Sequence, residues 1–260
     1  MRVGIGRVPS RVVRLLILPV TALVLWQLAG QLQLVNTVLL PPPSKVAAAA
    51  LKTLRSGELL NHLRVSLERI LYALGIALVA GVPLGIFMGL YRPFEEVVDG
   101  FLNLLRPVPP LAWIPLAILW FGVGEGAVVF ITLLAAFFAV LLNTFAGVRS
   151  VDKSLLRAAL SLGAPRHVLI LRVVLPATLP SIFTGTRIAL GVSWGSIVAG
   201  ELVAATSGLG FMITFYREVL RTDLILVGMV SIAVTGLLMD RALGWLERRV
   251  LPWRVGLQLR

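Results

Sequence analysis

Residues 157–176 read RAALSLGAPRHVLILRVVLP, and this basic segment connects two long apolar stretches at 127–148 and 182–205. Apolar stretches of that length can cross a bilayer as helices, so the segment between them is expected to lie at the membrane surface. The side of the membrane on which this loop lies then sets the orientation of the spans on either side of it.

The loop itself predicts two short helices. Asp152 is a residue type that accepts the free amide protons of a helix's first turn, which favours a helix over 153–162. Gly163 suits the left-handed residue at which many helices end, and Pro165 prevents continuation. A second helix over 166–174 is expected to end before the next proline. The result is a compact protrusion; the alternative is a plain basic hairpin held on lipid headgroups.

Composition places the chain in a membrane. Of its 260 residues, 58% are hydrophobic and 14% are charged, whereas roughly a quarter are charged in soluble domains. A net charge of +12 would favour nucleic acid as the partner of a soluble protein. Here the basic residues crowd the ends of apolar stretches, where they meet anionic headgroups. We therefore expect membrane lipids, and no nucleic acid, as partners of that charge.

Six stretches approach the roughly 20 residues that a helix needs to cross the ~30 Å hydrocarbon core. They are residues 15–32, 67–90, 107–121, 127–148, 182–205 and 224–243. The sequence therefore predicts an all-α membrane protein of six spans in one domain, 1–260. The basic residues ahead of the first stretch are also typical of a signal peptide, but no small-residue cleavage site follows, which favours an uncleaved span.

Two spans carry distinctive residues. The third has four prolines between 107 and 115, so it is kinked or broken, and irregular backbone at membrane depth needs protein or a watery cavity beside it. The second has Gly81, Gly85 and Gly89 at four-residue spacing, a pattern that lets another helix come close. We expect the third span to contribute to a pathway and the three glycines to serve helix packing.

The basic residues also orient the spans. With the N-terminus inside, sixteen Lys and Arg residues, including Arg106, fall in cytoplasmic segments, and seven, including Arg69, fall outside. This asymmetry satisfies the positive-inside rule. Both termini, the segment 1–14 and the loop 149–180 are then predicted to face the cytoplasm.

The outer connection 33–66 is long for a turn between spans. It contains three consecutive prolines, then an alanine-rich stretch, 46–54, of high helix propensity. A short helix lying on the outer membrane surface is expected there.

No motif for chemistry on a bound substrate is present. The chain has no Cys, its two His are about a hundred residues apart, and no Gly is followed by Lys, so no phosphate-binding P-loop exists. No Ser/His/Asp set or carboxylate pair stands out on facing helices. We therefore expect no metal site, no cofactor bound by this chain and no enzymatic activity; any energy source must come from a partner.

Several segments resemble one family. The loop is similar to the "EAA" loop of ABC importer permeases, and three further segments look like the nitrate, sulfonate and taurine branch of that family, with taurine-type members nearest in pattern. These segments are Ala158-Ala159 with Gly163 and Leu175-Pro176 in the loop, then LRPVPPLAWIPL at 105–116, LWFGVGE at 119–125 and GELVAATSGLGF at 200–211. The resemblance covers almost the whole chain.

The resemblance implies the permease of a type I importer in a bacterial cytoplasmic (inner) membrane. Its implied partners are a second permease copy, expected to form a homodimer, two cytoplasmic ABC ATPases that hold ATP and Mg²⁺, and a periplasmic or lipid-anchored binding protein. The implied substrate is a small organic anion, taurine or another sulfonate, with nitrate, bicarbonate and a small heterocycle as alternatives.

The resemblance also implies ATPase-docking residues. They are Arg157, Ala158, Ala159, Leu162, Gly163 and Ala164. Arg157 stands where the general motif has Glu, so the contact of that carboxylate with the ATPase does not carry over to this chain.

Candidate pathway residues interrupt the apolar third and fifth spans. They are Trp113, Arg187, Ser193, Trp194 and Glu201. Charges inside a span are unfavourable and usually face a bundle interior or water. Arg187 allows two interpretations, a snorkelling or paired side chain and an anion-attracting gate. Glu201 is near the outer end, where its carboxylate could reach water, and Trp194 is either a pathway residue or ordinary packing.

Two other protein classes compete with the importer. A secondary transporter often has repeated halves and paired intramembrane acids, and neither is evident here. A membrane scaffold without transport leaves the polar fifth span and the proline-rich third unexplained. Co-purification of an ATPase would separate both classes from the importer.

Overall fold

The computed structural model describes residues 10–255, and all regular secondary structure in that range is helical. Residues 1–9, which hold most of the predicted cytoplasmic N-terminal segment, and residues 256–260 lie outside the described range. The chain divides into two compact units, residues 1–60 with 212–230 and residues 61–211 with 231–260.

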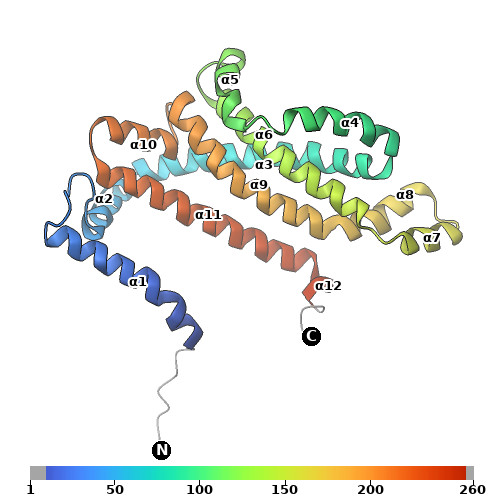
Figure 1. The fold of residues 1–260 in the computed structure, drawn as a ribbon, viewed down its shortest axis with the longest axis horizontal. Coiled ribbons are helices and arrows are strands. Elements are labelled where there is room, and N and C mark those ends of the chain that lie inside the picture. The colour runs from blue at the N-terminus through green and yellow to red at the C-terminus, as the bar shows by residue number, and fades with distance from the viewer. Residues whose placement is uncertain (1–9, 256–260) are drawn as a thin grey trace, which may run out of the picture. The chain divides into compact units, whose positions relative to one another are not determined.

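Three helices that lie side by side form the centre of the larger unit (Figure 1): α3 (Glu58–Leu90), α6 (Glu125–Arg149) and α9 (Leu175–Ala204). Small and β-branched side chains join them in one buried cluster of Ala77, Ala136, Val140 and Ala189. Side chains this small allow close helix approach, which is what favours helix association where lipid removes the hydrophobic driving force.

The glycines of α3 lie against α6. A Cβ at Gly85 would stand 2.8 Å from the Leu141 carbonyl oxygen, and one at Gly81 would stand 3.2 Å from a methyl carbon of Val140. A Cβ at Gly89 would likewise collide with Val148. The two backbones are therefore too close for a larger residue at these positions. At Gly85 and Gly89 the atoms in the way include a backbone oxygen or a β-carbon, which cannot move aside as the end of a flexible side chain can.

The predicted third span has different boundaries in the structure. One helix, α4 (Arg92–Leu105), precedes the prolines, and a 3₁₀ turn, η1 (Pro110–Trp113), leads into α5 (Ile114–Phe121) after them. The two parts are bent by 80°. Proline cannot donate a helical hydrogen bond and disfavours a helical residue before it, so the chain breaks where the prolines gather.

The predicted end of the second loop helix before Pro176 is wrong. After α7 (Lys153–Ser161), the helix α8 (Arg166–Leu169) runs through a π-helical stretch, η2 (Ile170–Val174), directly into α9. Pro176 lies in the first turn of α9. The wider π turn lies just where the proline ring would meet the carbonyl of the preceding turn, which lets the helix continue through the proline.

The smaller unit contains α1 (Ser10–Gln31), α2 (Pro43–Arg55) and parts of α10 (Leu209–Glu218) and α11 (Thr222–Val250). The predicted helix at 46–54 is confirmed as α2. Its start is tied to α1, because Gln27 exchanges two 3.1 Å hydrogen bonds with Ser44. A short helix, α12 (Pro252–Val255), ends the described chain.

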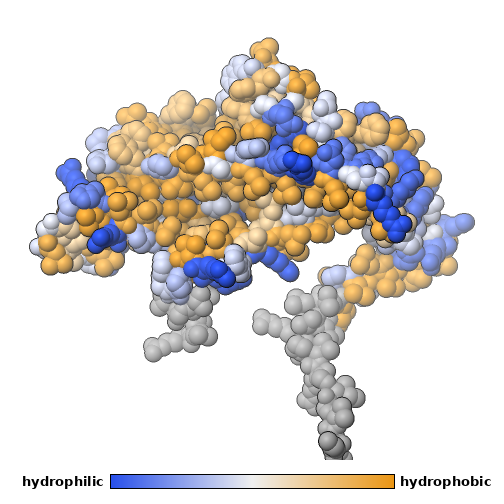
Figure 2. Space-filling view, turned by 180° about the vertical axis from the view of Figure 1, so that it is seen from behind, coloured by the Kyte–Doolittle hydropathy of each residue, from blue (hydrophilic) through white to orange (hydrophobic). Residues whose placement is uncertain are grey.

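Four described helices are long and apolar enough to cross a membrane: α3, α6, the continuous 166–204 helix and α11. They confirm the second, fourth, fifth and sixth predicted spans. The bent pair of α4 and η1–α5 would count as a fifth, and α1, which contains most of the first predicted span, is 22 residues long. Figure 2 shows apolar side chains over most of the face in view, as a lipid-facing surface requires.

Candidate functional site

The start of the loop between α6 and α9 is held by a side-chain cap. The Asp152 carboxylate accepts the backbone N–H of Ser154 at 2.8 Å and caps α7, as predicted. That backbone N–H, with a further bond from the Ser154 side chain, lowers the pKa of Asp152 from its ordinary value. The cap is therefore charged, and effective, at neutral pH.

The end of α7 is a Schellman motif centred on Gly163. Gly163 has a φ of +76°, its N–H donates to the Leu160 carbonyl at 2.9 Å, and the N–H of Ala164 donates to the Ala159 carbonyl at 3.0 Å. A left-handed residue is needed for this pair of bonds, and glycine adopts it without strain. The prediction that Gly163 ends the helix in a left-handed conformation is confirmed.

The protrusion presents apolar side chains to solvent. No residue of α7 is buried, and Leu162 at its end is 88% exposed. Arg157 points into solvent with only a 3.3 Å bond from its Nε to the Lys153 carbonyl. An exposed apolar tip on a basic loop is typical of a protein-binding surface.

A second feature is a cavity of about 380 Å³ in the larger unit, which we call the Trp113 cavity. Trp113 lines it together with the connection between α4 and η1, the middle of α6 and two residues of α9, Val192 and Ser196. Its polar side chains are Arg106, Asn143 and Ser196. Of the five predicted pathway residues, only Trp113 is among those that line this cavity.

Ser193 and Trp194 point elsewhere. Both are buried, and neither the Ser193 hydroxyl nor the Trp194 indole N–H has a hydrogen-bond partner among the described residues. The indole lies against α11, where a Cβ at Gly236 would stand 3.4 Å from its Nε1. In this conformation Trp194 contributes to the contact between α9 and α11.

Arg187 is neutralised by α11. Its Nε lies 2.8 Å from Asp240 Oδ1, and its Nη2 lies 3.6 Å from Glu247. The guanidinium remains about half exposed. Of the two interpretations of this residue, the geometry matches the paired side chain, because two carboxylates already face the charge.

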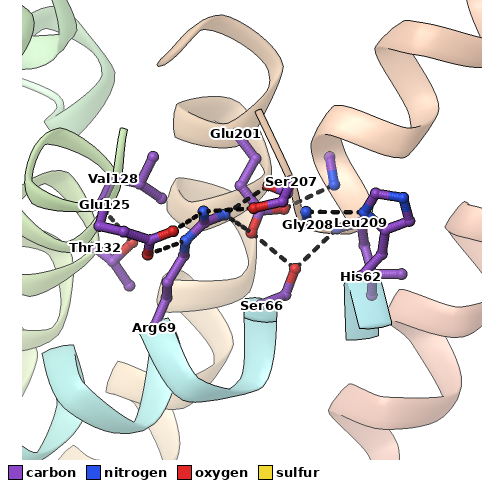
Figure 3. Close-up of polar contacts among 11 residues, drawn as sticks. His62, Ser66, Arg69, Glu125, Val128, Thr132, Glu201, Ser207, Gly208 and Leu209 are labelled. Carbon is purple, nitrogen blue, oxygen red and sulfur yellow. Dashed lines mark hydrogen bonds and ion pairs between the residues drawn. The ribbon is translucent and has the colours of Figure 1, made fainter. Parts of the chain in front are cut away.

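Glu201 belongs to an ionic cluster that sequence reasoning missed, in which Arg69 and Glu201 are buried and Glu125 is exposed (Figure 3). Arg69 of α3 lies between two carboxylates, with Nε 2.7 Å from Glu125 Oε2 and Nη1 2.8 Å from Glu201 Oε1. The same Nη1 donates to the Ser207 carbonyl at 2.7 Å. The Arg69 cluster, as we call Ser66, Arg69, Glu125, Glu201 and Ser207, thus joins α3, α6 and α9 to the segment after α9.

The cluster also holds that segment in place. Glu201 accepts the Ser66 hydroxyl and the Gly210 N–H, each at 2.7 Å, and Ser66 in turn accepts the N–H of Leu209 at 2.9 Å. His62 Nδ1 accepts the Gly208 N–H at 3.1 Å, which requires an unprotonated Nδ1. The buried polar groups of this turn are therefore satisfied by side chains of α3 and α9.

Two sequence-based placements are corrected by this cluster. The Glu201 carboxylate does not reach water, since its side chain is fully buried, and Arg69 is not a loop residue, since it is 1% exposed within α3. The sequence did contain a signal for this cluster, because Arg69 lies inside the predicted span 67–90. A positive charge within a span calls for a carboxylate partner, and Glu201 was the obvious candidate.

Comparison with known proteins identifies relatives along nearly the whole chain. Residues 81–252 match the family described as binding-protein-dependent transport system inner membrane component. The chain is 43% identical to the taurine transport system permease protein TauC of Escherichia coli, over 89% of this chain and 86% of that protein. It is 40% identical to the putative aliphatic sulfonates transport permease protein SsuC of Bacillus subtilis, over 92% and 87%.

Two further similarities are informative. The bicarbonate transport system permease protein CmpB of Synechococcus elongatus is 38% identical over 72% of this chain and 67% of that protein. Among solved structures, a chain of the methionine ABC transporter MetNI, in an inward facing conformation, matches with a TM-score of 0.54 at 22% identity, over 70% of this chain and 94% of that one. The structural match shows a shared fold.

Proposed function

The chain belongs to the family of inner membrane components of binding-protein-dependent transport systems, and we propose that two copies of it form the pathway for a small organic anion, taurine or another sulfonate. As an ABC importer permease, the chain is a multi-pass membrane transport subunit. Family membership sets aside the secondary transporter and the scaffold that the sequence alone left open.

The substrate class is supported by the relatives. Those named for taurine and for aliphatic sulfonates share about two residues in five with this chain over most of its length. The relative named for bicarbonate supports a second candidate, the same machinery carrying a small inorganic anion. All three names refer to compounds that carry an anionic group, a sulfonate or a bicarbonate, so we propose that an anionic group of the substrate is recognised in either case.

The partner ATPase is proposed to dock on the protrusion formed by Arg157, Ala158, Ala159, Leu162, Gly163 and Ala164. The observation that carries this proposal is the rigid, capped α7 ending in an exposed apolar tip, in a chain that lacks a P-loop. Two ATPases would hold ATP and Mg²⁺, and a binding protein would deliver substrate from the outside. The loop and both termini would then face the cytoplasm of a bacterial cell, as the charge asymmetry predicts.

The proposed mechanism is alternating access. ATP binding would close the ATPases and draw the two protrusions together, and the spans would move as rigid bodies to open outward. Because α8 continues through η2 into α9 without a break, a displacement at the protrusion would be passed directly to that span.

Co-expression with candidate ATPases tests the docking proposal. Native chain, Ala159→Asp and Gly163→Pro are compared for ATPase pull-down and for ATPase activity in lipid nanodiscs, with Ala48→Asp at an exposed helical alanine of α2 as the control. We expect the native chain and Ala48→Asp to retain the ATPase and the two loop variants to lose it. Retention by both loop variants would contradict docking at this loop.

Uptake into proteoliposomes tests the substrate. With binding protein and ATPases present, labelled taurine, an alkanesulfonate, nitrate and bicarbonate are compared. Sulfonate uptake that depends on ATP supports the proposal, whereas uptake of bicarbonate alone would support the second candidate.

A further inference from the structure

We infer that the Trp113 cavity is an anion-binding station on the transport pathway and that the Arg106 guanidinium is its charged ligand; this inference rests on the proposed function. Arg106 follows the 14 residues of α4 and caps that helix with a backbone bond to Leu102. It therefore lies roughly 20 Å along the helix from Arg92, in the turn that leads to η1, where its exposed side chain lines the Trp113 cavity.

Arg106 differs from Arg69 and Arg187 of the same unit in having no carboxylate partner within the described part of the chain. Arg69 and Arg187 each face two carboxylates. Among the described residues, no carboxylate lies within ion-pair distance of Arg106. A cation without a carboxylate partner that lines a mainly apolar cavity creates a positive potential there, so a mobile anion is its natural complement.

The surroundings of Arg106 suit a small amphiphilic anion. The cavity volume of about 380 Å³ is within the range of small-molecule sites, and its lining is mainly apolar. Asn143 and Ser196 add polar groups to the same cavity. The Asn143 side chain donates one N–H to the Ala139 carbonyl at 2.8 Å, which leaves its second N–H and its carbonyl oxygen for a ligand. A guanidinium with a few neutral polar groups can bind sulfonate or carboxylate oxygens without a metal.

A polar path leads along α4 to this cavity. Exposed polar side chains recur on one face of the helix at three- and four-residue spacing: Arg92, Glu96, Asp99, Asn103 and Arg106. The first two form an ion pair, and Asn103 donates to Asp99 at 2.8 Å. Such a face cannot lie in lipid, so water is expected along it up to the unpaired cation at its end.

The charge of the cavity can be measured without an ATPase or a substrate. The chain has no Cys, and Val192, which lines the cavity, is 44% exposed, so Val192→Cys supplies one reporter thiol. Its reaction rates with anionic sulfonatoethyl and cationic trimethylammonioethyl methanethiosulfonate are compared in detergent. Adding Arg106→Gln is expected to lower the anion-to-cation rate ratio about tenfold, because a focused positive potential raises local anion concentration by that order.

Matched variants control this experiment. Arg64→Gln removes an exposed, paired arginine of α3 that lies outside the cavity and the polar face of α4, and it should leave the ratio within about twofold. Arg106→Lys should preserve most of the ratio. With Arg106 intact, ethanesulfonate should slow labelling while ethylammonium at equal concentration should not. An unchanged ratio in Arg106→Gln, or no protection by ethanesulfonate, would overturn the inference.

Uptake then connects the station to transport. In the complete transporter, Arg106→Gln should reduce sulfonate uptake at least tenfold while ATPase association persists, and Arg106→Lys should recover part of it. Native-like uptake by Arg106→Gln would overturn the station while leaving the importer intact. Absence of anion uptake by the native complex would instead refute the proposed function, whatever the thiol ratio shows about the charge of the cavity.

Discussion

Arg69 and Glu201 form an ion pair of 2.8 Å between Nη1 and Oε1, and at most 2% of either side chain is exposed. The pair joins α3 to the end of α9 across 132 residues of sequence. Removing Arg69 would leave the Glu201 carboxylate buried without a counter-charge, which costs far more than the pair itself contributes, whereas removing Glu201 would leave Arg69 paired with Glu125.

Arg69→Gln is therefore expected to lower the free energy of unfolding by about 3–5 kcal/mol, the range for breaking a buried pair. Arg64→Gln is the matched control, since Arg64 pairs with Glu68 on the exposed side of the same helix and such pairs contribute only about 0.3–0.5 kcal/mol. Thermal stability in detergent, followed by fluorescence-detected size-exclusion chromatography, compares the two. Equal melting temperatures would show that the Arg69 cluster does not stabilise the fold.

Gly85→Leu should separate α3 from α6. The substituted side chain has no room beside the Leu141 carbonyl oxygen and Thr144, and overpacking in a close contact costs about 1–3 kcal/mol or more. Gly75→Leu, on the same helix with no atom near its Cβ position, is the control and should melt like the native chain. If both variants were equally stable, the helix contact would not depend on glycine.

The phenol of Tyr216 should lose its proton at a higher pH than an ordinary tyrosine. Burial and the hydrogen bond that it donates to Glu58 raise its pKa to about 12. Because the folded state holds this proton more tightly than the unfolded state, the contribution to stability is complete below the ordinary pKa near 10 and is lost as pH rises through 12. The difference in tyrosinate absorbance between native chain and Tyr216→Phe should have its midpoint near pH 12.

Glu58→Gln tests the cause of that shift. Without the carboxylate, the midpoint of the same difference titration should move toward the ordinary value. A midpoint that stays in place would assign the whole shift to burial.

The side-chain cap of α7 is expected to support ATPase docking only when residue 152 supplies an oxygen that accepts the Ser154 N–H. Asp152→Ala leaves the Ser154 N–H without its acceptor and should weaken ATPase retention in the pull-down, whereas Asp152→Ser, another good cap, should retain it. Because the pKa of Asp152 is lowered, its carboxylate is charged and caps the helix at and above the ordinary carboxyl pKa. The cap is lost only when the pH falls through the lowered pKa. Native retention should therefore be unchanged between about pH 6 and 8. Equal retention by both variants would make the cap irrelevant to docking.

Local features of the protrusion could be predicted because they depend on near neighbours. The Asp152 cap, the left-handed Gly163 and the break at the prolines of the third span all follow from backbone preferences within a few residues. The same reasoning failed at Pro176, where a π-helical stretch accommodates the proline. A wider turn is a property of the assembled helix and leaves no mark in residue preferences.

The side-chain partners could not be predicted in the same way. Arg69, Arg106 and Arg187 are the same residue type in similar apolar surroundings, and their spacing does not reveal which are neutralised. In the structure Arg187 meets α11, Arg69 meets α6 and α9, and Arg106 faces a cavity. Only the packing of helices distant in sequence separates a structural charge from one that is free to bind a ligand.

The sequence by itself determined that this protein is a helical membrane permease with a capped loop, because apolar length, proline position and helix-ending residues act locally along the chain. Only the tertiary structure decided which charges are buried in pairs and which one remains in the Trp113 cavity. The energy of a charge in a low-dielectric interior depends on the groups within a few ångströms of it, and those groups come from helices that are far apart in the sequence.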